Sequence, residues 1–157
     1  MRTKKENVAA QKNKKCPLDK KCLSENIIYQ ATVTQPSKES KTYIGLTSTD
    51  FKQRLGVHTQ NFKDLTTSQT SLSKHIWELK SKRIEPKITW KIIDRGRPFS
   101  PNHRVCQLCN KEKFYILFKP GMAELNSKSE TFSACRHVKS ALLIKKIRKS
   151  SKKSPGN

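Results

Sequence analysis

The stretch KTYIGLTSTDFKQRLGVH, residues 41–58, runs from a strand pattern directly into a helix pattern. Residues 41–47 are rich in β-branched and aromatic side chains, which favour strands. Ser48 or Thr49, together with Asp50, can cap a helix that continues to about Phe62. Arg54 lies at the edge of the apolar stripe of this helix. The stripe itself consists of Phe51, Leu55, His58 and Phe62.

The sequence on either side supplies the rest of a small sheet and its helices. Residues 26–35 alternate in polarity, and the breaker PSKES that follows them predicts a hairpin with residues 41–47. Residues 71–82 and 106–118 predict helices, and residues 86–94 predict a third strand. We expect a short last helix in residues 135–143. This order predicts an α+β fold with a small, three-stranded, mostly antiparallel sheet flanked by helices.

The composition bounds the function. The chain of 157 residues carries 34 Lys and Arg against 12 Asp and Glu, a net charge of +22. Such an excess favours a polyanionic partner, and nucleic acid is the usual one. The lysine-rich ends, residues 1–15 and 143–157, are predicted to be disordered basic tails around one domain of residues 16–142. Either tail could serve as a nuclear localisation signal or bind phosphate nonspecifically.

The chain has no apolar run long enough for a transmembrane helix, and its N-terminus lacks the apolar region of a secretory signal. We therefore expect no membrane partner and an intracellular setting, in which cysteines are thiols or metal ligands rather than disulfides.

The cysteines form a candidate zinc site. Cys106 and Cys109 make a C-x₂-C pair, and Cys135 and His137 supply two more ligands. Three thiolates and one imidazole would complete a tetrahedral structural zinc site. Cys16 and Cys22 are lower-ranked ligands that could pair with Cys106 and Cys109 instead. The remaining alternative is that all of these are free thiols.

The residues also supply the parts that phosphodiester hydrolysis needs. An arginine such as Arg54 matches the oxygens of a phosphate, and a divalent metal held by a carboxylate such as Glu112 stabilises the leaving oxygen. Tyr29 or Tyr43 could act as a base if neighbouring cations lower its pKa. The alternatives are a solvated helix face for Glu112, half-buried strand positions for the tyrosines, and packing roles for Trp77 and Trp90, which could otherwise stack on bases.

The order of these residues resembles the GIY-YIG nuclease family. The second signature is intact at residues 43–45, and Arg54 and His58 form the family's Arg-x-x-x-His arrangement. Glu112 and Asn126 fall where the family has its metal-binding glutamate and a late asparagine. The first signature is changed, since residues 27–29 read Ile-Ile-Tyr, with Ile27 in place of glycine. The match covers residues 26–130.

Several segments look more narrowly like the nuclease domain of Penelope-like or related eukaryotic retroelements, where it usually follows a reverse transcriptase. These are CPLDKKCLSENIIYQATV, KTYIGLT, LSKHIWELK and SACRHVKSALL. The resemblance implies nicking of DNA, with Mg²⁺ or Mn²⁺ held by Glu112, and a nuclear protein. It makes Tyr29 the general base or water-orienting group, Tyr43 its partner and Arg54 the phosphate ligand. His58 either contacts substrate or base or is a buried core histidine; Asn126 orients neighbours or a phosphate, or caps a helix.

The sequence therefore predicts a metal-dependent DNA endonuclease of a eukaryotic mobile element. One alternative is a nucleic-acid-binding protein that keeps the fold without cutting, which the loss of the glycine at Ile27 favours. A basic ribosomal or chromatin protein is another, but it leaves the ordered Tyr, Arg, Glu and Asn unexplained.

Overall fold

The computed structural model describes residues 16–67, 70–100, 102–103, 105–135 and 137. The predicted basic tails, residues 1–15 and 143–157, lie outside this part of the chain, as does most of the predicted last helix. Among the described helices, none combines the length and the hydropathy that a membrane span requires.

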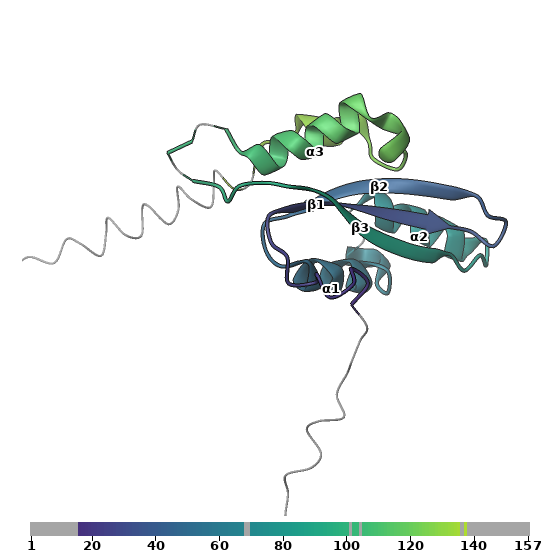
Figure 1. Ribbon diagram of the computed structural model, residues 1–157. Coiled ribbons are helices and arrows are strands. Elements are labelled where there is room, and N and C mark those ends of the chain that lie inside the picture. The colour runs from purple at the N-terminus through teal and green to yellow at the C-terminus, as the bar shows by residue number, and fades with distance from the viewer. Residues whose placement is uncertain (1–15, 68–69, 101, 104, 136, 138–157) are drawn as a thin grey trace, which may run out of the picture.

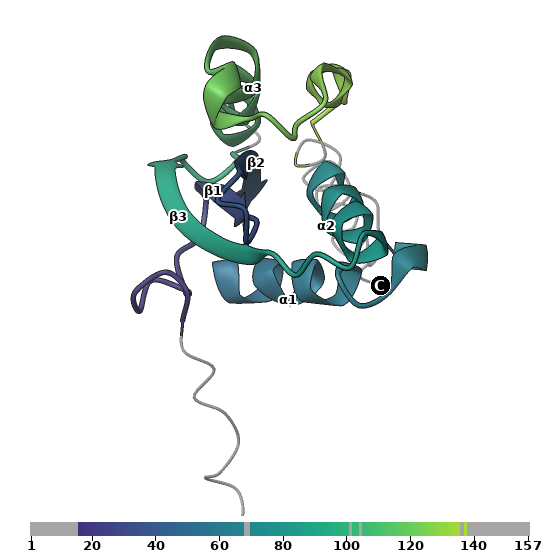
Figure 2. The same ribbon diagram turned by 90° about the vertical axis from the view of Figure 1, so that its right-hand side faces the viewer.

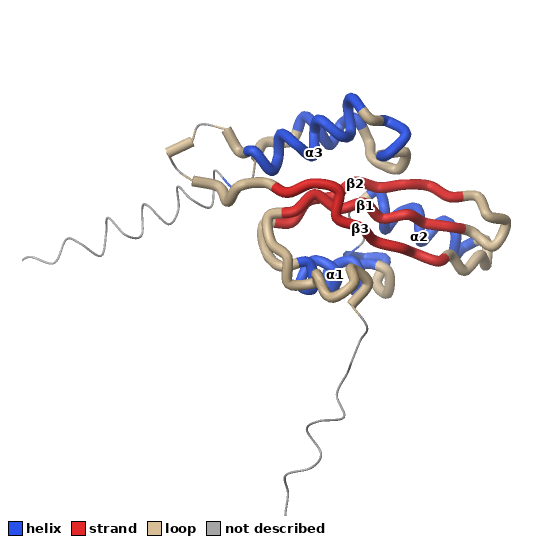
Figure 3. Tube along the Cα trace, in the orientation of Figure 1, coloured by secondary structure: helices blue, strands red, loops and turns tan. Residues whose placement is uncertain are grey.

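The protein is an α+β fold with one three-stranded sheet (Figures 1 and 3). The strands and α-helices follow in the order β1 (Ile27–Thr34), β2 (Ser40–Thr47), α1 (Phe51–Asn61), α2 (Ser71–Ser81), β3 (Lys87–Arg95) and α3 (Gln107–Phe118). The sheet order is β2-β1-β3, and β1 pairs with both neighbours in antiparallel fashion. The pairing of β1 with β3 shifts register between Ile28 and Tyr29. The three predicted strands and the predicted helices that correspond to α1, α2 and α3 are confirmed to within about two residues at each end.

The two faces of the sheet have separate cores because side chains alternate along β1. Ile27, Tyr29, Ala31 and Val33 point toward α1 and α2 and pack on Phe51, Leu72, Ile76 and Leu79. Ile28 and, from β2, Ile44 point the other way and pack on Leu108 and Ile116 of α3. Figure 2 shows α1 and α3 on opposite sides of the curved sheet.

Capping fixes where α1 and α2 begin. The predicted cap of α1 is Asp50, whose carboxylate accepts from the backbone N–H of Gln53 at 2.9 Å. Thr70 caps α2 in a capping box with Ser73. Each cap satisfies amide groups that the helix itself leaves unpaired. Arg54 and His58 therefore have a defined position on α1.

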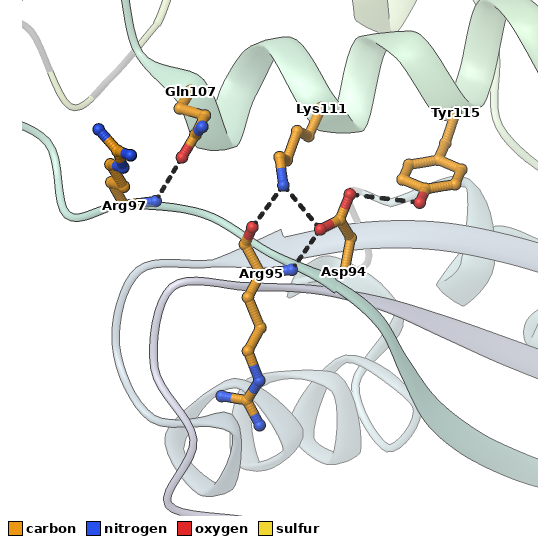
Figure 4. Close-up of polar contacts among 6 residues, drawn as sticks. All are labelled: Asp94, Arg95, Arg97, Gln107, Lys111 and Tyr115. Carbon is orange, nitrogen blue, oxygen red and sulfur yellow. Dashed lines mark hydrogen bonds and ion pairs between the residues drawn. The ribbon is translucent and has the colours of Figure 1, made fainter.

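Polar contacts from the end of β3 hold α3 over the sheet (Figure 4). Lys111 forms an ion pair with Asp94 at 2.7 Å and donates to the carbonyl of Arg95 at 2.6 Å. The Tyr115 hydroxyl donates to the other Asp94 oxygen at 3.3 Å, and the Arg97 N–H donates to Gln107 at 2.7 Å. These contacts lie along α3 at positions 107, 111 and 115, so they fix the rotation of the helix about its axis.

Candidate functional site

Tyr29 depends on the glycine opposite it. In the β1–β2 register Tyr29 pairs with Gly45, and its ring lies against that glycine. A Cβ atom at position 45 would stand 2.4 Å from the Tyr29 hydroxyl oxygen and 2.5 Å from Cζ. No side chain fits at such distances. The Gly45 of the second signature is therefore required by the ring of Tyr29.

The Tyr29 hydroxyl joins α1 to the sheet through two hydrogen bonds. It lies 2.7 Å from Nε2 of His58, and Nε of Arg54 donates to it at 3.0 Å. Burial, aided by the Arg54 charge, lowers the pKa of His58 to about 3, so the imidazole is neutral. Since its oxygen accepts from Arg54, the neutral Tyr29 hydroxyl donates to Nε2 of His58.

Burial dominates the ionisation of both tyrosines. Burial raises the pKa of Tyr29 to about 12 in spite of Arg54, and burial raises the pKa of Tyr43 well above its usual value. The sequence expectation that cations lower a tyrosine pKa is not met here, because desolvation outweighs the single guanidinium. Both hydroxyls are protonated at neutral pH.

His58 lies in the interior and is fully buried. Its ring stacks on Phe62 at 6.0 Å and lies 5.3 Å from the ring of Trp90. Nδ1 has no hydrogen-bond partner within the described part of the chain. This is the buried core histidine that the sequence left as an alternative, and its contact with Tyr29 is its link to the site.

A cleft opens beside Arg54 at the end of β2. Its volume is about 270 Å³. Leu46 to Thr49, Gln53, Arg54 and Val57 line it. The guanidinium of Arg54 uses Nε to bind Tyr29 and keeps its terminal nitrogens for other partners. An arginine held in this way can bind a phosphate in the cleft.

Glu112 approaches the same end of β2 from α3. Burial and, next, the neighbouring Glu130 raise the pKa of its carboxyl to about 7, while Arg54 and the backbone of Leu46 favour the charged form. Leu46 also lines the cleft of Arg54. Glu112 in turn acts on the pKa values of Tyr29 and Tyr43. The carboxyl therefore lies within electrostatic reach of the Arg54–Tyr29 pair, and not on a solvated outer face of α3.

Asn126 ties the segment after α3 to β2. Its side-chain oxygen accepts from the Ile44 N–H at 2.7 Å, and its amide nitrogen donates to the Ile44 carbonyl at 2.8 Å. It also donates to Glu130 at 3.1 Å. Ser127, not Asn126, caps the short helix Lys128–Phe132. Asn126 is thus a positioning residue that holds the edge of the sheet next to Tyr43.

Glu130 is the residue near the site that the sequence did not single out. Its carboxylate accepts from Asn126 and from the hydroxyl of Ser71 on α2, and its charge acts on Glu112. The one signal in the sequence that could have pointed to Glu130 was the scarcity of acidic residues in the chain. The SKSE sequence around Glu130 is typical of a helix start, so it gave no indication of a functional residue.

The predicted zinc ligands gather at the start of α3. The ligand atoms of Cys106, Cys109, Cys135 and His137 all lie within 4.8 Å of one another. Cys109 Sγ is 3.4 Å from Cys135 Sγ and 3.3 Å from Nδ1 of His137, and Cys106 Sγ is 3.4 Å from the same nitrogen. Four ligands of one tetrahedral ion are separated by such distances. The group is a candidate metal-binding cluster, and it includes Cys106, the N-cap of α3.

The prediction for Cys16 and Cys22 is wrong. These two cysteines form a disulfide, with Cα atoms 5.9 Å apart. They pack against the core on the α1 side of the sheet, whereas Cys106 belongs to the core on the α3 side. They therefore cannot share an ion with Cys106 and Cys109, and the expectation that the chain forms no disulfide fails with them.

The tryptophans pack within the protein. Trp90 lies 5.5 Å from Phe51 and 5.9 Å from Tyr29, ring centroid to ring centroid. Trp77 donates its indole N–H to the carbonyl of Asn61 at 2.9 Å and carries Lys80 over its ring. Both side chains therefore have packing contacts within the protein.

Comparison with known proteins leaves the site to be interpreted from its own geometry. No family model, curated protein or solved structure matches the chain.

Proposed function

We propose that the chain is a metal-dependent DNA endonuclease of the GIY-YIG type, which nicks its substrate. The observation that supports the proposal is the approach of Arg54 and Glu112, from opposite faces of the sheet, to the end of β2 beside two buried tyrosines. A cationic fork and a carboxyl beside an open cleft are the groups that hydrolysis of a phosphodiester requires. The resemblance adds the origin, a eukaryotic mobile element, and the nuclear location.

Arg54 binds the scissile phosphate in this proposal. Its bond to Tyr29 restrains the guanidinium plane at the wall of the cleft that Arg54 lines. The chain of contacts from His58 through Tyr29 to Arg54 runs from the core outward, and it restrains the side chain before substrate arrives.

Tyr29 and Tyr43 orient rather than abstract a proton. With a pKa of about 12, Tyr29 is ionised to a negligible extent at neutral pH. Its hydroxyl proton lies on the bond to Nε2 of His58, and that bond keeps Arg54 in place. Of the two roles given to Tyr29 by the resemblance, orientation is the one that its surroundings favour.

Glu112 is the proposed ligand of a catalytic Mg²⁺ or Mn²⁺. A half-buried carboxyl whose pKa is raised to about 7, next to a second acid, is a group that a divalent cation would stabilise in its charged form. Such an ion, when bound, supplies positive charge at the leaving oxygen. We assign the Cys106–Cys109–Cys135–His137 cluster separately to structural zinc, since four protein ligands leave no open position on the ion.

A specific observation favours the alternative, a nucleic-acid-binding protein without cleavage activity. Tyr29 has no exposed surface, and Ile27, which replaces the glycine of the first signature, is fully buried in the same core. A protein that only binds would tolerate both features.

A nicking assay on supercoiled plasmid decides between the two. The wild-type protein should nick with Mg²⁺ or Mn²⁺ and remain inactive without them. Arg54→Ala should lower the rate by about 10²-fold or more, and Glu112→Gln should remove the metal dependence along with the activity. Arg97→Ala, at an exposed site near the start of α3, is the matched control. Binding without metal-dependent nicking would support the alternative; full activity in both variants would refute the mechanism.

A further inference from the structure

A second and larger groove lies on the side of α1 away from the Arg54 cleft. Its volume is about 870 Å³. It lies between the segment before β1, one face of α1 and the start of β3, and Figure 2 shows that segment beside α1. Its floor is apolar, with Leu55, Ile88 and Trp90. The catalytic proposal makes no use of this groove.

Charge surrounds the apolar floor. Lys20, Lys52 and Lys63 line the groove, and no Asp or Glu lines it within the described residues. The apolar Leu23 also lines the groove and is 73% exposed. A ligand that presents negative charge to the lysines and an apolar surface to Leu55, Ile88 and Trp90 would therefore complement the groove.

The wall formed by the segment before β1 is already in place. Cys16 and Cys22, which line the groove, are joined by the disulfide. The first turn of α1 binds the same segment, because the N–H of Phe51 donates to the carbonyl of Ser24 at 3.1 Å and the N–H of Lys52 to that of Cys22 at 2.8 Å. A ligand would enter a preformed groove, which reduces the entropy cost of binding.

Gly56 gives an independent indication. It is exposed in the middle of α1 and lines the groove, and a Cβ atom there would have nothing within 4 Å. Glycine at such a position costs about 1 kcal/mol relative to alanine. Because no contact among the described residues requires the missing side chain, we attribute the bare backbone to close approach of a group from outside.

We propose that this groove binds a single strand of nucleic acid, with its phosphates on the lysines and its bases on the apolar floor. Bases of a single strand are free to contact apolar and aromatic side chains, whereas a duplex hides the faces of its bases. The proposal deepens the proposed function, on which it rests, by placing a second contact surface for the substrate across α1 from Arg54.

The test measures affinity, without added divalent metal so that no cleavage occurs. A fluorescein-labelled oligothymidine is titrated by anisotropy at several salt concentrations, beside a labelled duplex hairpin of similar length. Lys52→Glu/Lys63→Glu should weaken binding of the strand by about tenfold or more, and should reduce the slope of log K against log salt by about 1.4, as expected for two lost phosphate contacts. The control, Lys87→Glu/Lys91→Glu, makes the same change in net charge at exposed positions of β3 outside the groove.

A charge-neutral pair of variants tests the shape of the groove. Gly56→Ala should already weaken binding of the strand, because its Cβ atom takes the space of the approaching group, and Gly56→Leu, which also fills the rim, should weaken it severalfold more. The proposal would be overturned if the two lysine double variants lost affinity for the strand equally and Gly56→Leu bound it normally. It would also be overturned if the variants lost affinity for the duplex hairpin but not for the strand. If the wild type binds the strand in this way but never nicks, only the catalytic proposal fails.

Discussion

Replacing Gly45 by alanine should disrupt the site from within. The new methyl group would lie 2.4 Å from the hydroxyl oxygen of Tyr29 and 2.5 Å from Cζ, both far below van der Waals contact. Tyr29 is fully buried between the sheet, Phe51 and His58, so the ring has no free space into which it can move. Either β2 separates from β1 locally, or the ring leaves its position and gives up its hydrogen bonds.

Two costs set the magnitude. Overpacking a well-filled core costs about 1–3 kcal/mol. Displacement of the hydroxyl leaves His58 Nε2 without its partner in the interior, and an unpaired buried polar group costs about 1–3 kcal/mol. Because the chain adopts the rearrangement with the smaller total free-energy cost, we expect Gly45→Ala to lower the free energy of unfolding by about 2–4 kcal/mol.

Urea unfolding, followed by circular dichroism, measures this loss. Gly56→Ala is the matched control, because its new Cβ meets nothing within 4 Å and should stabilise α1 by about 1 kcal/mol. A Gly45→Ala protein within about 0.5 kcal/mol of wild type would contradict the contact between Tyr29 and Gly45, and with it the description of the site.

Two further predictions concern ionisation and metal. In the absence of divalent metal, the contribution of Glu112 to stability should fall as the pH rises from about 4.5 to about 7, by up to about 3 kcal/mol, because burial raises the pKa of Glu112 to about 7 and ionisation then opposes folding. The difference in unfolding free energy between Glu112→Gln and the wild type should therefore grow over that pH range. The control, Glu85→Gln at an exposed position, should show no such growth. Parallel pH profiles of stability for Glu112→Gln and the wild type would contradict the burial of Glu112. Elemental analysis of the purified protein should find one zinc per chain. Cys109→Ser should lose the zinc and unfold at a lower urea concentration. A wild-type protein that is stable without zinc would show that the four residues are not a zinc site.

The fold followed from local patterns because each pattern had a single physical meaning. Alternation along residues 26–35 predicted a strand; the structure covers both of its faces, one by α1 and α2 and the other by α3. Asp50 marked the start of α1 because a carboxylate there satisfies free amides. The C-x₂-C pair and the later Cys and His pointed to one cluster, since four such ligands need only converge within the span of one ion.

The features that were missed depend on tertiary contact or on burial. Nothing in the order of residues pairs Cys16 with Cys22 rather than with a distant thiol; the turn that brings them together is set by packing on α1. The pKa of Tyr29 follows from full burial, which the sequence does not measure. Glu130 reaches the site from a short helix far along the chain, through Asn126 and Ser71.

In the proposed mechanism the site is divided between two faces of the sheet, so the metal cluster at the start of α3 should matter for activity although Arg54 is not part of it. Arg54 and Tyr29 are fixed by the core beneath α1, but Glu112 is fixed by whatever positions α3. That helix is held along one side by Asp94 (Figure 4). The candidate metal-binding cluster lies at its start. Loss of the cluster would free the start of α3 while leaving Arg54 in place. Removing the metal should therefore impair steps that need Glu112 before it impairs binding of phosphate by Arg54.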